Sequence, residues 1–473
     1  MRQPGDVLLV ACYELGHQPL AVAWPAAFLE RAGYRPAVLD LSVEPLDAEK
    51  VTRAKLIAVS VPMHTALRVA VPATEQIRKL NPTAHVTFYG HYAALNATEL
   101  LDGCADSVLA GELEAELVEL VRQREAAVDP GEARRANASL SERASPGSAA
   151  AEPRRVQLAK LAFPVPARTA LPSLEKYAHV ERDGGRELAA YVEASRGCKH
   201  LCRHCPIPPV YGGRFFVVPV ETVMADVRQQ VAAGAGHVTF GDPDFLNGPR
   251  HALAVARALH AESPRVTFDF TAKVEHLLRR REDLAELAAL GCVFVITAAE
   301  SLDDQVLDRL AKGHTRADIV EALGAVRAAG IAPRPTWVAF TPWTTLEGYR
   351  EWLDFLAAEA LVDHVDPVQY GIRLLIPPGS LLLDLPELRG QLGDPAPGTF
   401  HYRWTHADPR VDRLADEVSA AVAAAAEHDE DAALTFDRVR TRAAAAAGAP
   451  PPPALGLPSG RPRPPRLTEP WFC

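Results

Sequence analysis

The amino-acid sequence predicts an α/β protein built from two consecutive domains and a C-terminal tail. Two series of short apolar runs, separated by helical patterns, occupy residues 1–126 and 161–380. This alternation is typical of βαβ units, whose strands form a parallel sheet. A chain of 473 residues is also long enough for two or three domains of about 100–200 residues each. We therefore expect a doubly wound domain, then a partial (α/β)6 TIM-like barrel, and then a proline-rich tail.

Residues 1–126 are expected to form the doubly wound domain. Its strand candidates are the apolar runs 6–13, 34–42, 54–62, 85–90 and 106–111. Helical patterns lie between these runs, so helices should cover both faces of the sheet. Residues 127–160 then contain almost no large apolar side chains, and we expect a flexible linker there.

Residues 161–380 are expected to form the barrel. The six strand candidates are 188–195, 237–242, 266–272, 292–299, 333–340 and 368–376. Six βα units leave a barrel incompletely closed, and in such folds the chemistry lies at the C-terminal ends of the strands. Residues 381–473 form an extension with helix candidates at 418–427 and 434–447, followed by a semi-rigid proline-rich arm.

The composition excludes several classes of protein. The net charge of -10 argues against a general nucleic-acid-binding surface. The sequence has no apolar run of the roughly 18–20 residues that a membrane helix needs, and its first residues do not resemble a signal peptide. We expect a cytoplasmic protein with no membrane partner. The odd number of cysteines, seven, does not suit a disulfide framework, and Cys12, Cys104 and Cys292 are expected in the core.

The strongest local feature is a loop with three closely spaced cysteines directly after the first barrel strand. Cys198, Cys202 and Cys205 have the spacing Cys-x3-Cys-x2-Cys. Three thiolates can hold three irons of a four-iron cluster and leave the fourth iron open. A zinc site would need a fourth ligand, for which His200 and His204 are candidates. Three unrelated buried cysteines are the remaining interpretation.

This loop resembles the signature of the radical S-adenosylmethionine (radical SAM) superfamily, apart from His204, where an aromatic residue is common. The resemblance implies that the three cysteines bind a [4Fe–4S] cluster and that SAM binds the open iron. It further implies reductive cleavage of SAM to a 5′-deoxyadenosyl radical, which abstracts hydrogen from a substrate. The substrate would be a small molecule or a peptide, and a one-electron donor such as flavodoxin or ferredoxin would be a partner.

Two further segments resemble SAM-contacting segments of that superfamily. They place Gly241, Asp242 and Asp244 after the second barrel strand and Glu300 after the fourth. An ordinary strand-end turn and a carboxylate at a helix N-terminus are the alternative interpretations. Lys312 matches a recurring lysine. Residues 341–343 read Thr-Pro-Trp where relatives often have Gly-Pro-Gly, which puts that SAM contact in doubt.

The first domain resembles the cobalamin-binding domain of cobalamin-dependent radical SAM enzymes over about residues 5–121. The matching residues, which the resemblance implies contact cobalamin, are Gly90, His91, Gly111, Glu112 and Glu114. The domain lacks the Asp-x-His-x-x-Gly motif that supplies a cobalt ligand in many cobalamin proteins. His17 and His64 lie near the carboxyl ends of early strands and could be ligands, but a solvated or hydrogen-bonded histidine is the favoured interpretation of both. A domain kept for substrate docking or packing is the alternative to cobalamin binding.

The end of the chain, Glu-Pro-Trp-Phe-Cys473, resembles the tail of the CUAEP/CCAEP-tail radical SAM proteins, which continues through Cys-Sec or Cys-Cys to Ala-Glu-Pro. Our hypothesis is that the sequence stops at a selenocysteine codon, which would make this a selenoprotein with a redox tail. A vicinal Cys-Sec pair would be redox-active or would bind soft metals. A genomic stop triplet other than TGA contradicts this hypothesis.

The sequence as a whole therefore predicts a radical SAM enzyme. Cobalamin-dependent methyl transfer and maturation of a peptide are the two continuations left open. The alternative from another class is a non-catalytic module that holds zinc or a cluster, or binds soft metals or selenium through its tail.

Overall fold

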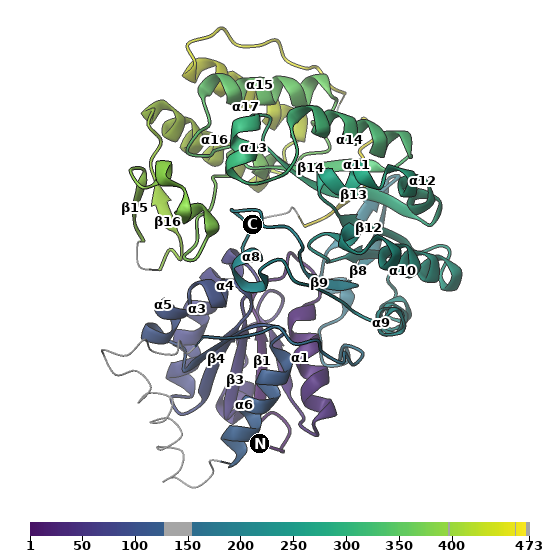
Figure 1. Cartoon of the computed structure of the whole chain (residues 1–473), viewed down its shortest axis with the longest axis vertical. Coiled ribbons are helices and arrows are strands. Elements are labelled where there is room, and N and C mark those ends of the chain that lie inside the picture. Colours follow the sequence, from purple (N-terminus) through teal and green to yellow (C-terminus); the bar gives the residue numbers. More distant parts are fainter. Residues whose placement is uncertain (127–153, 396–397, 459, 470–473) are drawn as a thin grey trace.

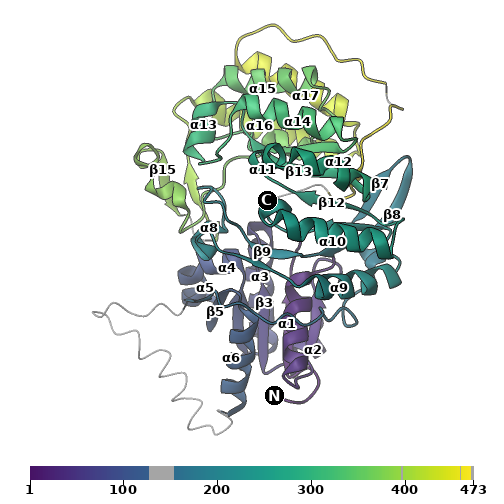
Figure 2. The same ribbon diagram turned by 45° about the vertical axis from the view of Figure 1, so that its right-hand side comes forward.

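A computed structural model describes residues 1–126, 154–395, 398–458 and 460–469 (Figure 1). The N-terminal domain, purple to blue, packs against one side of the larger teal and green domain. Figure 2 shows the same arrangement from a second direction. In the described part of the chain, no helix combines the length and apolar character needed to cross a membrane.

The N-terminal domain is a parallel six-stranded sheet with strand order β2-β1-β3-β4-β5-β6. Its strands are β1 (Val7–Ala11), β2 (Ala37–Asp40), β3 (Leu56–Ser60), β4 (His85–Tyr89), β5 (Ser107–Gly111) and β6 (Arg154–Gln157). Its helices are α1 (Leu20–Arg31), α2 (Ala48–Arg53), α3 (His64–Leu80), α4 (His91–Leu95), α5 (Ala97–Gly103) and α6 (Glu114–Ala126).

Alternating side chains of each strand enter two separate apolar cores. On β1, Val7 and Leu9 pack with α1 and α6, whereas Leu8 and Val10 pack with α2 and α3 on the opposite face. Strand order reverses at β1, with β2 on one side and β3 on the other, and ligands of doubly wound sheets bind at the carboxyl ends of the strands near this point. We call this edge of the sheet the ligand edge.

One sequence expectation for this domain is wrong in part. Residues 154–157 were assigned to the linker of 127–160, but they form β6 and pair with β5. Pairing uses the backbone groups at the free edge of β5, which composition does not reveal. The rest of the expected linker, 127–153, lies outside the described residues.

The second domain contains a curled sheet with strand order β14-β13-β12-β11-β8-β7-β17. Its strands are β7 (His179–Arg182), β8 (Gly185–Val192), β11 (His237–Phe240), β12 (Thr267–Thr271), β13 (Cys292–Glu300), β14 (Ala332–Trp337) and β17 (Arg466–Leu467). Helices of this domain, among them α9 (Val220–Ala232), α10 (Pro249–Glu262), α12 (Arg281–Ala289) and α14 (Arg316–Ala328), cover its outer face (Figure 2). The five strands from β8 to β14 are parallel, as predicted.

The sixth predicted strand, 368–376, is not a strand. Its first part lies in the 3-10 helix η3 (Pro367–Gly371), and a single bridge joins Arg373 to Phe340. The apolar residues that favoured a strand serve another contact, because the Tyr370 ring packs against Phe436 at 5.5 Å between ring centroids. The barrel is therefore a half-barrel with an open side.

The C-terminal extension packs beside this opening. It contains α16 (Pro409–Glu427) and α17 (Ala432–Ala446), which include the predicted helical patterns, and the hairpin of β15 (Leu392–Pro395) and β16 (Tyr402–Trp404). The Asp408 side chain caps α16, and Pro409 follows at the first helical position, so this helix begins earlier than its apolar pattern indicated.

Candidate functional site

The three cysteines lie on a loop that leaves the carboxyl end of β8. A short antiparallel pair, β9 (Ser195–Gly197) and β10 (Phe215–Val217), closes the base of this cysteine loop. Cys198 and Cys202 are buried and Cys205 is partly buried, and none of the three forms a disulfide. Asn247 Nδ2 donates to Cys198 Sγ at 3.6 Å. Burial raises the pKa of Cys205 to about 12, so metal binding here must release protons.

A buried cation faces two of the cysteines. Lys312 Nζ lies 3.2 Å from Glu300 Oε1, and His204 Nε2 is also 3.2 Å from that oxygen. Burial alone would lower the pKa of Lys312, but Glu300 raises it, and negative charge on Cys202 and Cys205 acts in the same direction. Burial would likewise raise the pKa of Glu300, but Lys312 and His204 hold it well below its usual range. Lys312 is thus placed to stabilise negative charge on the cysteine loop.

Both ends of the cysteine loop are bonded to one turn of the N-terminal domain, between β5 and α6. Before the loop, Arg196 Nη1 donates to Glu114 Oε1 at 2.6 Å. After the loop, at the end of α8 (Pro208–Tyr211), Tyr211 Oη donates to Glu112 Oε1 at 2.9 Å. The N-terminal domain therefore fixes the cysteine loop on both sides. We call these four residues the interdomain clamp.

The clamp places one guanidinium among buried acidic side chains. Arg196 also donates to Glu193 through Nε at 3.1 Å, and its guanidinium lies over the rings of Trp24 and Phe163. The Oε2 atoms of Glu112 and Glu114 have no hydrogen-bond partner among the described residues. Burial raises the pKa of Glu112 to about 7, although Arg196 lowers it. One guanidinium thus faces three carboxyl groups, of which Glu112 can take up a proton near neutral pH.

Of the four residues predicted to contact SAM, three bond to other residues of the chain and thereby hold nearby loops in place. Asp242 accepts from Ala194 N at 2.9 Å and from Ser195 Oγ, directly before the cysteine loop, and burial raises its pKa to about 7. Asp244 caps a 3-10 turn through Leu246 N. Glu300 forms the ion pair with Lys312 described above. A Cβ on Gly241, the fourth predicted contact, would lie 2.2 Å from the Tyr191 ring.

Sequence reasoning missed a polar group beside the cysteine loop. His276 Nδ1 lies 2.8 Å from Asp244 Oδ2, and its Nε2 lies 3.3 Å from His200 Nε2. Lys273 Nζ is 3.1 Å from His200 Nδ1. His276 and Lys273 follow β12 and belong to no motif, so only the parallel arrangement of the strands could have indicated their place.

The residues predicted to contact cobalamin all lie at the ligand edge. Gly90 and Gly111 have φ of +111° and +73°, and a Cβ on either would lie within 2.6 Å of a backbone oxygen, so internal packing alone requires glycine there. His91 lies against the Tyr211 ring, and burial lowers its pKa to about 4. Glu112 and Glu114 belong to the interdomain clamp.

The alternative histidines differ in their surroundings. His17 is buried, stacks on Tyr191 at 4.6 Å and has an unpartnered Nδ1; burial lowers its pKa to about 3. His64 Nε2 instead contacts Thr399 O at 2.9 Å. As expected for core residues, Cys12 and Cys292 are buried, whereas Cys104 is only partly buried.

Cys473 and the predicted redox tail lie outside the described residues.

The segment that reads Thr-Pro-Trp in place of Gly-Pro-Gly is held by its own contacts. Trp343 N donates to Thr341 Oγ1 at 3.2 Å, and the guanidinium of Arg309 lies over the Trp343 ring.

The residues present suit a thiolate-bound cluster and a cobalamin. Three free thiols lie together, with a buried ammonium facing two of them, which suits an anionic iron–sulfur cluster. At the ligand edge, His17 and His91 each have an unpartnered Nδ1 and a lowered pKa, so both are neutral at pH 7. Neutral imidazole is the form that binds metals.

Comparisons with known proteins match both domains. Residues 192–356 match the radical SAM superfamily, and residues 7–121 match the B12 binding domain. Over 344 residues the chain is 25% identical to the hopanoid C-3 methylase of Methylococcus capsulatus, an alignment that covers 71% of this chain and 64% of the methylase. It is 26% identical over 207 residues to the ribosomal protein uS12 methylthiotransferase RimO of Porphyromonas gingivalis, covering 39% and 45% of the two chains.

Two solved structures share the fold. The cobalamin-dependent SAM radical enzyme OxsB, with aqua-cobalamin and SAM bound, has a TM-score of 0.62 at 15% identity and covers 87% of this chain and 66% of its own. The radical SAM methyltransferase TsrM from Kitasatospora setae, with cobalamin and a [4Fe–4S] cluster bound, has a TM-score of 0.56 at 18% identity, covering 75% and 73%. The chain spans less than two thirds of the length of the methylase and of OxsB.

The matched residues, the cysteine loop and the strand order agree with the resemblance found in the sequence. The chain therefore contains a B12-binding domain in residues 7–121, followed by a radical SAM domain in residues 192–356.

Proposed function

We propose that the chain is a cobalamin-dependent radical SAM enzyme that transfers a methyl group to its substrate. The interdomain clamp is the observation that carries this proposal. It bonds the loop that would hold the cluster to the ligand edge of the B12-binding domain, at Glu112 and Glu114. Two cofactor sites that must cooperate in one reaction are thereby held next to each other.

The residues divide between the two cofactors. Cys198, Cys202 and Cys205 would hold the [4Fe–4S] cluster, and the ligand edge around His17 and His91 would hold cobalamin. When bound, the cluster supplies the electron that cleaves SAM, and cobalamin supplies a carrier for the methyl group.

The chain's own residues would position the cysteine loop and neutralise negative charge on it. Lys312 offsets negative charge near Cys202 and Cys205, and Glu300 keeps the Lys312 ammonium in place. Asp242 fixes the backbone at Ala194, where the chain enters the cysteine loop. Burial raises the pKa of Asp242 to about 7, so near neutral pH its carboxyl can hold or release a proton close to that entrance.

The partners belong to the same proposal. We assign a one-electron donor such as flavodoxin or ferredoxin, a substrate that is a small molecule or a peptide, and a cytoplasmic location, where thiols stay reduced. A selenocysteine codon after Cys473 remains our hypothesis, and the genomic triplet that follows decides it.

The test is an anaerobic assay of the full chain reconstituted with iron, sulfide and hydroxocobalamin, then given SAM and dithionite. We expect 5′-deoxyadenosine and a cobalamin absorption spectrum that changes on binding. The variant with Cys198→Ala, Cys202→Ala and Cys205→Ala should form no 5′-deoxyadenosine, whereas Cys12→Ala, outside the loop, should keep the activity.

Other results would decide against the proposal in different ways. Formation of 5′-deoxyadenosine without any cobalamin binding would contradict methyl transfer and favour a non-methylating maturase. Bound zinc with no 5′-deoxyadenosine would contradict the enzyme and favour the metal-holding module.

A further inference from the structure

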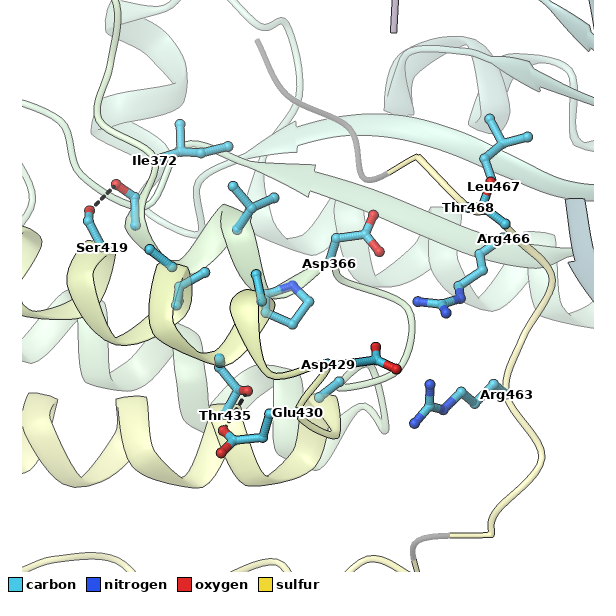
Figure 3. Close-up of a pocket in the computed structure, with 18 residues that line it drawn as sticks. Asp366, Ile372, Ser419, Asp429, Glu430, Thr435, Arg463, Arg466, Leu467 and Thr468 are labelled. Carbon is cyan, nitrogen blue, oxygen red and sulfur yellow. Dashed lines mark hydrogen bonds between the residues drawn. The ribbon is translucent and has the colours of Figure 1, made fainter. Parts of the chain in front are cut away.

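A pocket of about 710 Å³ lies at the open side of the half-barrel (Figure 3). One wall is η3, which lies beside the end of β14, and α16 and α17 form a second wall. Arg463, Arg466, Leu467 and Thr468 of the C-terminal segment form the wall on the opposite side. The chain's own C-terminal segment therefore closes part of the opening.

This segment is held as an added strand. In β17, Arg466 pairs with Glu181 of β7 and Leu467 with Val180, in antiparallel register. Thr468 N donates to His179 O at 2.8 Å, which continues the ladder. We call residues 466–469 the strap.

The strap also makes side-chain contacts that depend on residue type. Arg466 Nη2 lies 2.9 Å from Glu181 Oε2. Leu467 packs against the apolar cluster of Val180, Phe294 and Ile296 inside the curled sheet. The β7 edge thus offers a carboxylate to Arg466 and an apolar surface to Leu467.

The strap leads towards the ligand edge. β17 is antiparallel to β7, and β7 is antiparallel to β8, so the strap runs in the direction of β8, whose carboxyl end begins the cysteine loop. At its far end, Glu469 accepts from Tyr13 Oη at 2.9 Å and lies against Gly16, both in the loop after β1. An extended chain in this position therefore connects the open side of the barrel with the B12-binding domain.

The attachment of the strap is modest, and a separate anchor holds the preceding arm. The strand has two residues, and the side chains of the Arg466–Glu181 pair are 36% and 38% exposed, so the pair contributes little. Upstream, Arg461 forms two ion pairs, with Asp363 and Asp431. Arg461 therefore holds the arm at a point separate from β7.

We propose that the β7 edge is a docking site for an extended peptide that carries an arginine followed by an apolar residue, and that the strap occupies this site as a displaceable competitor. Main-chain hydrogen bonds to an exposed strand supply affinity in such docking, and side-chain pockets supply specificity. The site needs neither the cluster nor cobalamin, so its test is independent of the methyl transfer proposed above.

The experiment uses the full chain without cofactors and a fluorescent peptide with the sequence of residues 461–469, RPRPPRLTE. The tethered strap competes at an effective concentration on the order of 1 mM. Loosening it by Leu467→Asp should therefore strengthen binding of the peptide at least tenfold. Leu457→Asp, at a 39% exposed leucine on the same arm, is the matched control and should bind like the wild type. A peptide with aspartate in place of its leucine should bind to none of the chains.

Hydrogen exchange gives a second measurement that needs no variant. Excess peptide should speed exchange at the Thr468 amide of the wild-type chain, because the strap leaves His179 when the peptide takes its place. Equal peptide affinity for wild type and a folded Leu467→Asp chain would overturn the proposal, as would unchanged exchange at Thr468. If Leu467→Asp fails to fold, Arg466→Glu, which opposes Glu181, takes its place with the same expected gain.

Discussion

Breaking the buried ion pair of Lys312 and Glu300 should strongly destabilise this site. Lys312→Met would leave the Glu300 carboxylate buried without its main counter-charge. We expect this to lower the free energy of unfolding by about 3–5 kcal/mol, as measured by urea denaturation. Arg257→Gln, which breaks the exposed pair with Glu286, is the control and should leave stability nearly unchanged. Equal effects of the two variants would contradict our view of the pair.

His17 gives a prediction about pH. Burial lowers its pKa from 6.5 to about 3, so below pH 6.5 the unfolded chain takes up a proton that the folded chain does not. Between pH 7 and pH 4, the wild type should therefore lose about 3 kcal/mol more free energy of unfolding than His17→Gln does. Both proteins are measured without cobalamin. Leu434→Ala, at a 61% exposed site with no titratable side chain, should run parallel to the wild type. A parallel profile for His17→Gln would show that His17 is protonated in the folded chain.

At the scale of single residues, the sequence indicated the candidate site residues but not the residues to which they are hydrogen-bonded. The spacing of Cys198, Cys202 and Cys205 indicated a metal loop because the three thiols are close in sequence, and their role as ligands stays a prediction. Glu112 and Glu114 were also singled out, but their bonds to Arg196 and Tyr211 span 82 and 99 residues. Such pairings depend on how the two domains dock, which no local pattern encodes. The role of the two carboxylates towards cobalamin stays a prediction.

The interdomain clamp is the next larger unit, because it joins β9 and α8 to the turn between β5 and α6. A double-mutant cycle of Arg196→Met and Glu114→Gln should give a coupling energy of about 0.5–3 kcal/mol in urea unfolding. The same cycle on the exposed pair Arg228–Glu262 should give almost no coupling. Additive effects at Arg196 and Glu114 would mean that the clamp does not act as a unit.

Iron content is the readout that separates positioning of the cysteine loop from stability alone. A folded Arg196→Met chain should retain less cluster after reconstitution, because one end of its cysteine loop is released. Full cluster loading in that variant would contradict the positioning role.

Elements were predictable where an apolar pattern and its burial coincide, as in the five parallel strands of the half-barrel. They were not predictable where a segment takes its structure from a neighbour. β6 forms because β5 offers a free edge, and residues 368–376 pack against α17 although their composition favours a strand. β17 is the same case, since two residues become a strand only beside β7.

The whole molecule should unfold as one unit. Domains of one chain often move and unfold separately, because their interfaces are small. Here a single apolar core contains residues of β1, α1 and α6 together with residues of the barrel strands and their helices. We expect tryptophan fluorescence and far-UV circular dichroism to report coincident urea transitions. Two separated transitions would show that this shared core adds little to stability.

The position of β17 also bears on how the chain folds as the ribosome makes it. Glu181 on β7 precedes its partner Arg466 by 285 residues. At roughly 5–20 residues per second, that separation corresponds to on the order of 15–60 s of translation. During this interval the β7 edge has no strand beside it, and an open strand edge attracts other chains. The nascent protein is thus exposed to aggregation after β7 has emerged and before β17 has, and slow synthesis of the C-terminal third would prolong that interval.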